Sequence, residues 1–213
     1  MIIAIDGPAA SGKSSVAKEL AKRLGYLYID TGAMFRAVTF YALEQGLDEE
    51  DQLKTRLDKL HLKSIPGGIE IDGRKLYDEL RSKDVDLNVS YYSTMASIRS
   101  FLKDIQRQEA RRHNVIMDGR DIGTAVFPQA QVKIFLSASA EKRAERRFKQ
   151  RSNSLSYAQI LEDIKRRDKI DSSRNVAPLK QAKDAIFIDS SNLSLEEVIN
   201  KIEGIVKNVS SNS

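Results

Sequence analysis

The sequence contains no cysteine and only two histidines, His61 and His113, which lie far apart in the chain. The absence of cysteine excludes disulfides, thiolate nucleophiles and cysteine-ligated zinc. Two distant histidines argue against a histidine metal site and against a Ser-His-Asp triad. Any chemistry must therefore be carried by Asp, Arg and Lys side chains and by backbone groups.

Long apolar runs are also missing from the sequence. No stretch approaches the ~20 apolar residues that a membrane-spanning helix needs. No basic residue precedes the short apolar run at the N-terminus, as it would in a signal peptide. We therefore expect a cytoplasmic protein without a membrane partner. With 213 residues, the chain can bury one substantial core plus a small excursion domain, but not two full-sized domains.

The positive charge of the chain is concentrated in one segment. The net charge is +5, and residues 141–174 contain eleven Lys or Arg against six Asp or Glu, which accounts for the whole excess. Such a local basic region is expected of a protein that binds a small polyanion. A non-catalytic module that binds nucleic acid or a nucleotide through this segment is the alternative from another class. It is disfavoured because the aromatic residues that would stack on bases do not cluster near the basic ones.

Short apolar runs rich in β-branched or aromatic residues predict the strands of the fold. Amphipathic helical stretches separate most of them, and strands that alternate with helices imply a parallel sheet covered on both faces. We therefore expect a three-layer α/β fold with a five-stranded parallel sheet. Its predicted strands are residues 2–5, 26–29, 115–117, 132–136 and 185–188.

One region breaks this alternation. After a charged helix near residues 49–60 comes LKSIPGGIEIDGRKL, in which the Pro66-Gly67-Gly68 stretch predicts a turn and Asp72-Gly73 predicts a hairpin. We expect a small insertion with antiparallel strands at residues 62–89. The α/β core would then consist of residues 1–61 and 90–213.

The first strand leads into GPAASGKS, which matches GxxxxGK[ST] at every specified position and precedes a predicted helix. Small residues let the backbone curl so that its N–H groups face phosphate oxygens. We expect Lys13 to reach the β and γ phosphates of ATP and the Ser14 hydroxyl to bind Mg²⁺. The predicted ATP-binding residues are Gly7, Pro8, Ala9, Ala10, Ser11, Gly12, Lys13, Ser14 and Ser15.

A phosphate loop alone does not define the reaction, because GTPases, motor ATPases and small kinases all use one. A GTPase would need an NKxD stretch, which is absent, and motor ATPases are usually larger. The glycine-rich stretch could also be a turn with a surface lysine, but the strand before it and the helix after it favour phosphate binding.

Three further stretches place charged residues at the predicted carboxyl edge of the sheet, where open α/β folds bind ligands. They are IDTGAMFRA (29–37), IMDGRDIGTAVFP (116–128) and IKRRDKIDSSRNVAP (164–178). In the first, Thr31 is expected to cap a helix that carries Arg36. In the second, Asp118 is either a water-mediated Mg²⁺ partner or a cap of a helix or turn.

Together with NVS and VKIFLSAS, these motifs resemble the bacterial cytidylate kinases of the P-loop nucleoside monophosphate kinase group, over nearly the whole chain. The resemblance implies transfer of the γ-phosphoryl group of ATP to CMP or dCMP. It also implies that residues 62–89 bind the monophosphate and that a helical lid at about residues 146–157 closes over ATP. Thr31 and Phe35 stand where some relatives carry Ser and Tyr.

The same resemblance assigns roles to individual residues. The acceptor phosphate would be held by Arg36, Arg120 and Arg174. The cytosine edge would be read by Ser90, Arg99 and Asp121. The sugar hydroxyls would be faced by Arg167 and Asp171. Thr31 is also expected to contact the acceptor, and Lys13 completes a catalytic set with Arg36, Arg120 and Arg174.

Other acceptors on the same fold remain open from the residues themselves: UMP, AMP, or a small metabolite such as shikimate. The insertion and Asp121 favour a nucleotide with an exocyclic amine. Among Arg143, Arg146, Arg147, Lys149 and Arg151, we expect half or more to form a solvated face and two of the arginines to serve the lid. We expect a monomer that acts on small nucleotides.

Overall fold

The computed structural model describes residues 1–150 and 155–211 of the chain. It consists of two compact units, one formed by Met1–Tyr28 with His113–Ser213 and the other by Ile29–Arg112. No helix among the described residues is both long and apolar enough to span a membrane.

The described strands of the core form the predicted five-stranded sheet, in the order β2-β6-β1-β7-β8. Strand β1 lies between β6 and β7 and pairs with both in parallel, and β8 extends the sheet in parallel beyond β7. The prediction of a parallel α/β sheet is confirmed. The strands are β1 (Ile2–Asp6), β2 (Leu27–Asp30), β6 (Val115–Gly119), β7 (Val132–Ser137) and β8 (Ile186–Asp189).

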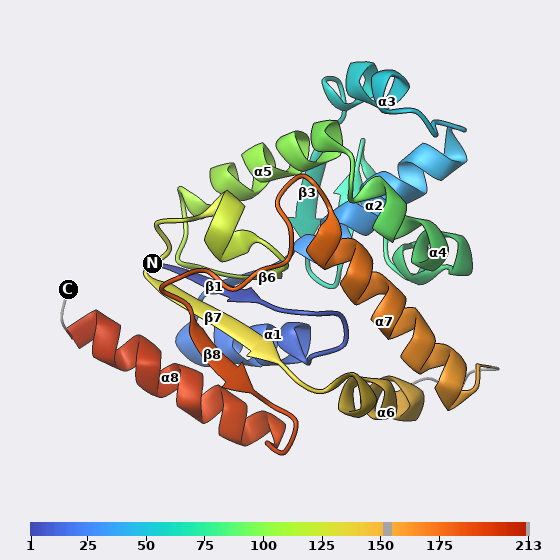
Figure 1. Cartoon of the computed structure of the whole chain (residues 1–213). Coiled ribbons are helices and arrows are strands. Elements are labelled where there is room, and N and C mark those ends of the chain that lie inside the picture. Colours follow the sequence, from blue (N-terminus) through green and yellow to red (C-terminus); the bar gives the residue numbers. More distant parts are fainter. Residues whose placement is uncertain (151–154, 212–213) are drawn as a thin grey trace. The chain divides into compact units, whose positions relative to one another are not determined.

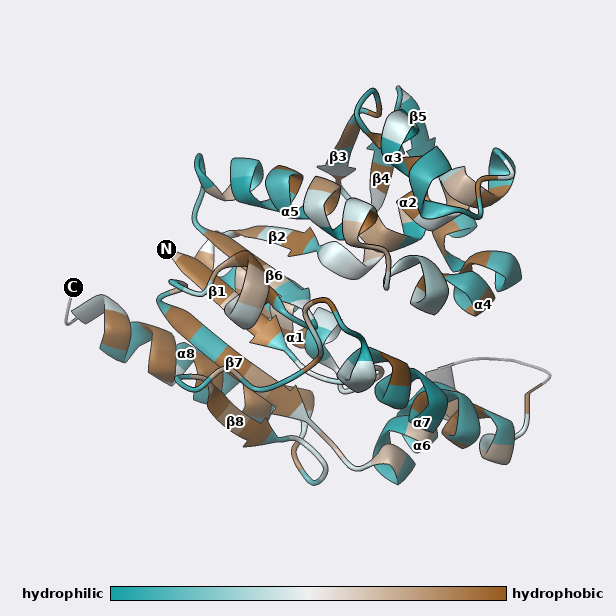
Figure 2. Cartoon of the chain, turned by 45° about the horizontal axis from the view of Figure 1, so that its top comes forward, coloured by the Kyte–Doolittle hydropathy of each residue, from teal (hydrophilic) through white to brown (hydrophobic). Residues whose placement is uncertain are grey.

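Helices α1 (Lys13–Leu24) and α8 (Leu195–Ser211) pack against the sheet of the first unit (Figure 1). Leu20 of α1 and Ile202 of α8 are fully buried in the same cluster as Ile5 of β1. Figure 2 shows hydrophobic residues along β1 and β7 and an alternation of hydrophobic and hydrophilic residues along α8. This pattern is expected of a buried parallel sheet covered by amphipathic helices.

Helices α6 (Ala140–Gln150) and α7 (Tyr157–Ser173) run side by side in the first unit (Figure 1). They bury Ala144 against Ile160 and Ile164. The predicted capping box at Ser156 is present and begins α7. The predicted lid, residues 146–157, covers the end of α6 and the start of α7, and its residues 151–154 lie outside the described part of the chain.

The second unit combines helices with a small sheet. Its strands are antiparallel in the order β3-β4-β5, and Ile69 and Ile71 of β4 are buried. The predicted antiparallel strands are thus confirmed, whereas the role of residues 62–89 in binding a monophosphate stays a prediction. The elements are α2 (Thr31–Glu44), α3 (Glu50–Leu57), β3 (Leu62–Ile65), β4 (Gly68–Ile71), β5 (Arg74–Leu76), η1 (Asp78–Arg81), α4 (Lys83–Tyr92) and α5 (Ala96–Ala110).

The expected cap of α2 was wrong by one residue. Asp30 is the N-cap, since its Oδ1 accepts a hydrogen bond from the backbone N–H of Ala33 at 2.8 Å. Thr31 is instead the first residue inside the helix. Asp30 has extended backbone angles, so its short carboxylate reaches the free N–H groups of the first turn.

Candidate active site

The phosphate loop joins β1 to α1, and its first glycine is fixed by a close backbone approach. A Cβ at Gly7 would lie 2.0 Å from the carbonyl oxygen of Leu136 in β7, so no side chain fits there. Lys13 begins α1, and its Nζ donates a hydrogen bond to the carbonyl oxygen of Pro8 at 2.7 Å. The loop therefore holds a buried ammonium group beside its own backbone.

Burial lowers the pKa of Lys13 to about 7, and the positive charge of Arg120 acts in the same direction. The carboxylates of Asp118, Asp6 and Asp171 partly oppose this shift. An anion bound beside the ammonium would favour its charged form. The electrostatics of the loop therefore suit a polyphosphate ligand.

Two hydroxyl groups and one carboxylate lie close together beside the start of α1. The hydroxyl of Ser14 donates to Asp118 Oδ2 at 2.7 Å, and the hydroxyl of Tyr28 donates to Asp118 Oδ1 at 2.8 Å. Hydroxyl and carboxylate oxygens are the ligands that Mg²⁺ prefers, and Mg²⁺ in kinases takes only one or two protein ligands beside substrate phosphates. Ser14 and Asp118 therefore fit such an ion.

Two arginines and two aspartates come together at the end of β6 and the end of α7, and all but the half-buried Arg120 are buried. Arg120 Nε lies 2.8 Å from Asp171 Oδ2. Arg174 lies 3.5 Å from Asp171 Oδ1 through Nη1 and 3.3 Å from Asp121 Oδ1 through Nη2. The structure thus unites four of the residues predicted to bind the acceptor.

Arg167 lies on α7, one turn before Asp171. Its Nε is 3.1 Å from Asp163 Oδ2, so the structure pairs it with a carboxylate of its own helix. Its predicted contact with a sugar stays a prediction.

The remaining predicted acceptor residues belong to the second unit. Arg36 on α2 donates from Nη1 to Asp86 Oδ1 at 2.6 Å and to the carbonyl oxygen of Leu80 at 3.0 Å. A phosphate bound by Arg36 would therefore either share the guanidinium with the Asp86 carboxylate or displace that carboxylate. Thr31 is buried at the start of α2, and Ser90 lies half-buried on α4.

Arg99 on α5 is also held in place within the second unit. Its Nη1 donates to the carbonyl oxygen of Ser93 at 2.9 Å, and its guanidinium lies 5.2 Å from the centre of the Phe35 ring. Phe35 has no hydroxyl to offer a ligand, and its ring makes this cation–π contact with Arg99.

The sequence could not single out Arg143 among the basic residues expected to divide between a lid and a solvated face. Arg143 is buried and donates to the carbonyl oxygens of Ala9 at 3.1 Å and Ala138 at 2.9 Å. Its guanidinium also lies 2.7 Å from Asp168 Oδ2. Arg143 therefore ties α6 to the phosphate loop and to α7. Arg151, from the same predicted face, lies outside the described residues.

Asp6 was also missed, because it directly follows the predicted apolar strand at residues 2–5 and no motif marked it. In the structure it is the last residue of β1. Burial raises its pKa to about 6, although hydrogen bonds from the backbone N–H groups of Gly123 and Ile122 oppose the shift. The negative charge of Asp121 adds to the shift, and the positive charge of Lys13 counters it.

This shift predicts a pH dependence of stability. Because the folded pKa lies above the ordinary value of 3.8, protonated Asp6 stabilises the fold fully below pH 3.8, and this contribution is lost as the pH rises to about 6. The loss amounts to about 3 kcal/mol. Between pH 4 and pH 7, the free energy of unfolding of the native chain should therefore fall relative to that of Asp6→Asn. Urea unfolding of both proteins measures this difference. A difference that is constant with pH would contradict the shift.

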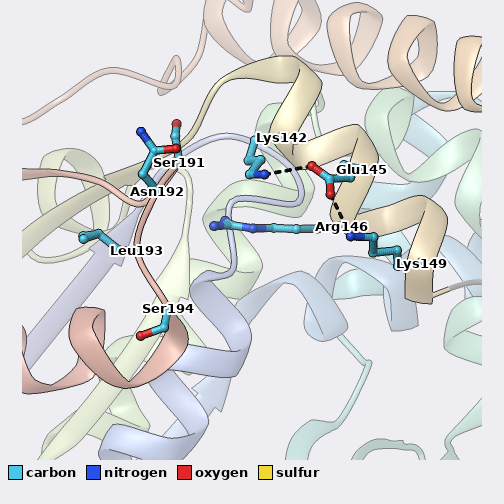
Figure 3. Close-up of a pocket in the computed structure, with 8 residues that line it drawn as sticks. All are labelled: Lys142, Glu145, Arg146, Lys149, Ser191, Asn192, Leu193 and Ser194. Atoms are coloured by element: carbon cyan, nitrogen blue, oxygen red, sulfur yellow. Dashed lines mark hydrogen bonds and ion pairs between the residues drawn. The ribbon is translucent and has the colours of Figure 1, made fainter.

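A pocket of about 450 Å³ lies in the first unit between α6 and the loop after β8. Figure 3 shows Arg146 extending from α6 toward this loop. Arg146 Nη1 donates to Ser190 Oγ at 3.1 Å and lies 3.5 Å from the carbonyl oxygen of Ser11 in the phosphate loop. Arg146 therefore links the pocket to the phosphate loop. It is lined by Lys142, Glu145, Arg146, Lys149, Ser191, Asn192, Leu193 and Ser194.

Comparison with known proteins gives a consistent match. The family model described as cytidylate kinase matches residues 3–208. The chain is 46% identical to a cytidylate kinase of Thermosipho melanesiensis over 208 residues, which cover 96% of each protein. It is 48% identical to a cytidylate kinase of Anoxybacillus flavithermus, over 96% of this chain and 95% of that protein.

Solved structures show the same fold at low sequence identity. The chain matches a shikimate kinase from Acinetobacter baumannii in complex with shikimate with a TM-score of 0.52 and 14% identity, over 97% and 93% of the two chains. It matches TT1252 from Thermus thermophilus with a TM-score of 0.52 and 18% identity, over 98% and 97%. At these identities the likeness concerns the fold alone.

Proposed function

The chain belongs to the cytidylate kinase family, and we propose that it transfers the γ-phosphoryl group of ATP to CMP or dCMP, which yields ADP and CDP or dCDP. One observation of the structure supports this best. The charges of Arg120 and Asp171 both act on the pKa of the buried Lys13 ammonium, which supports a single site for the phosphate loop and the acceptor in the first unit.

On the donor side, we propose that the backbone N–H groups of residues 7–15 bind the ATP phosphates. Lys13 would exchange its bond to the Pro8 carbonyl for one to a phosphate oxygen, and Ser14 and Asp118 would hold Mg²⁺. When bound, ATP and Mg²⁺ supply the transferred group and neutralise its charge. Tyr28 would fix the Asp118 carboxylate through its hydroxyl.

On the acceptor side, Arg120 and Arg174 would bind the phosphate of CMP. Asp171 accepts from both guanidinium groups, so they are oriented before the ligand arrives. The acceptor phosphate is already anionic near neutral pH, and the reaction therefore needs positioning and charge stabilisation rather than a general base. The roles of Thr31, Arg36, Ser90 and Arg99 in the second unit stay predictions.

The substrate assignment is tested by ADP release with a panel of acceptors. We expect the highest kcat/KM with CMP and dCMP, and lower values with UMP, AMP and shikimate. A preference for AMP or shikimate would replace the proposed acceptor. The absence of ADP release with every acceptor would favour a binding module. A cytoplasmic monomer without nucleic-acid or membrane partners fits the proposed activity.

The pocket beside α6 leads to a prediction about the donor. We propose that it takes the base or ribose of ATP, because Arg146, which lines it, also lies 3.5 Å from the carbonyl oxygen of Ser11 in the phosphate loop. Loss of a charged hydrogen-bond donor should raise the KM for ATP about tenfold in Arg146→Ala, with little change in the KM for CMP. Steady-state kinetics with each substrate varied in turn provide the measurement.

The control for this prediction is Lys165→Ala. It removes one positive charge from an exposed side chain of α7 that does not line the pocket. An equal rise in the KM for ATP in both variants would mean that only the general charge of the helices matters. An unchanged KM for ATP in Arg146→Ala would contradict the proposal that ATP binds in this pocket.

A further inference from the structure

We propose that Asp6 is a positioning residue for the acceptor, because its buried carboxylate fixes the turn that carries Arg120 and Asp121. The proposal rests on the proposed function, which gives those two residues to the acceptor. It concerns a contact between the end of β1 and the segment after β6, which lie over a hundred residues apart in the chain.

The contact is a bidentate one within the first unit. Asp6 Oδ1 accepts from the backbone N–H of Ile122 at 2.8 Å, and Asp6 Oδ2 accepts from that of Gly123 at 2.7 Å. These residues begin the single helical turn η2 (Ile122–Val126), whose own N-cap, Asp121, makes no side-chain capping bond. Asp6 therefore satisfies two N–H donors that a helix start leaves without partners.

The fit around this contact is tight. A Cβ at Gly123 would lie 3.3 Å from Asp6 Oδ2 and 3.2 Å from Lys133 Cδ. At the end of the same segment, the ammonium of Lys133 bonds to the carbonyl oxygen of Pro128 and to Asp184 Oδ2, the latter at 2.6 Å. The segment is thus fixed near its start by Asp6 and at its end by Lys133.

Asp121 belongs to the same turn through its backbone. Its carbonyl oxygen accepts from the N–H of Ala125 at 2.8 Å, while its carboxylate faces Arg174 at 3.3 Å. Arg120, one residue earlier, is directed toward Asp171. A shift of the turn by about 1 Å would therefore move both residues relative to the acceptor, and displacements of that size can cost about a hundredfold in rate.

The choice of a carboxylate at this position also needs an explanation. Asp6 is buried, and an ionised group there costs stability that an apolar residue would not. Only a carboxylate offers two acceptor oxygens to two adjacent N–H groups. The competing explanation is that Asp6 supports the phosphate loop, since Gly7 follows it directly. The two explanations differ in which substrate they affect.

The experiment compares Asp6→Asn, Asp6→Ala and Gly123→Ala. Asn keeps one acceptor oxygen, Ala keeps none, and Gly123→Ala crowds the carboxylate without removing it. We expect the KM for CMP to rise about tenfold in Asp6→Asn and in Gly123→Ala, and further in Asp6→Ala. The affinity for ATP, measured by calorimetry, should change by less than about twofold. Amide hydrogen exchange of residues 120–126 should become faster in all three variants.

The destabilisation control is Ile5→Val, which thins the core beside Asp6 without touching the turn. An equal loss of ATP and CMP affinity in the Asp6 variants would overturn the proposal in favour of phosphate-loop support. A comparable rise in the KM for CMP in Ile5→Val would overturn it in favour of general destabilisation. Failure of the proposed function would show separately, as a native enzyme that prefers another acceptor, and the comparison would then use that acceptor.

Discussion

Replacing Lys13 by alanine should lower kcat by at least about a hundredfold while the affinity for CMP changes little. Lys13 is buried in the phosphate loop, and its ammonium donates hydrogen bonds to the carbonyl oxygen of Pro8 and to Ser11 Oγ. Its contribution should therefore appear when charge develops on the transferred phosphoryl group. Turnover at saturating ATP and CMP measures this effect, and calorimetry gives the affinity for CMP.

Lys18→Ala is the matched control for Lys13→Ala. Lys18 lies on the same helix, α1, but is exposed. Its removal lowers the charge of the helix by the same amount and should leave kcat within about twofold of the native value. A near-normal kcat in Lys13→Ala would show that Lys13 is not a catalytic residue.

Local patterns predicted the parts of the fold that depend on local physics. The phosphate loop needs small residues at fixed spacing, and the capping box at Ser156 needs two side chains three residues apart. Both can be read from neighbouring letters of the sequence. The cap of α2 was wrong because Asp30 and Thr31 are both good caps, and the backbone angles that decide between them are not local in origin.

The residues that were missed make contacts across long sequence separations. Asp6 bonds to Gly123, Tyr28 to Asp118, and Arg143 to Ala9. Each lies in a stretch whose local pattern had a sufficient explanation, as core strand or as charged helix. Only the folded arrangement shows that these side chains hold the site in place.

The structure also changes how the base-reading hypothesis for Asp121 must be tested. From the sequence, the competing role for Asp121 is to orient Arg120 or the ligands of Mg²⁺. In the structure Asp121 pairs with Arg174, while Arg120 pairs with Asp171. Removal of Asp121 therefore takes one carboxylate partner from Arg174, which keeps Asp171 and the carbonyl oxygen of Ala177. Any shift of Arg174 would weaken binding of the phosphate of every nucleotide to the same extent.

Asp121→Ala should lower kcat/KM for CMP by about one to two orders of magnitude, and for UMP far less. Cytosine presents its N4 amine as a donor, which an ionised carboxylate can accept, whereas uracil presents the O4 oxygen, which a carboxylate repels. The ratio of the two kcat/KM values cancels any effect on the phosphate, because both substrates carry the same one. The CMP/UMP preference should therefore narrow even if Arg174 is displaced.

Asp121→Asn sharpens the comparison, since its amide can turn either its oxygen toward cytosine N4 or its NH₂ group toward uracil O4. It should therefore raise kcat/KM for both CMP and UMP relative to the alanine variant and leave the CMP/UMP ratio as narrow, while it keeps a side chain beside Arg174. If Asp121 only orients Arg174, both variants should lower kcat/KM for CMP and for UMP by the same factor. The ratio of the two values would then stay at its native level. Since the carboxylate is buried at 5% exposure, solvent cannot replace the lost acceptor, and a base-reading role must appear in that ratio.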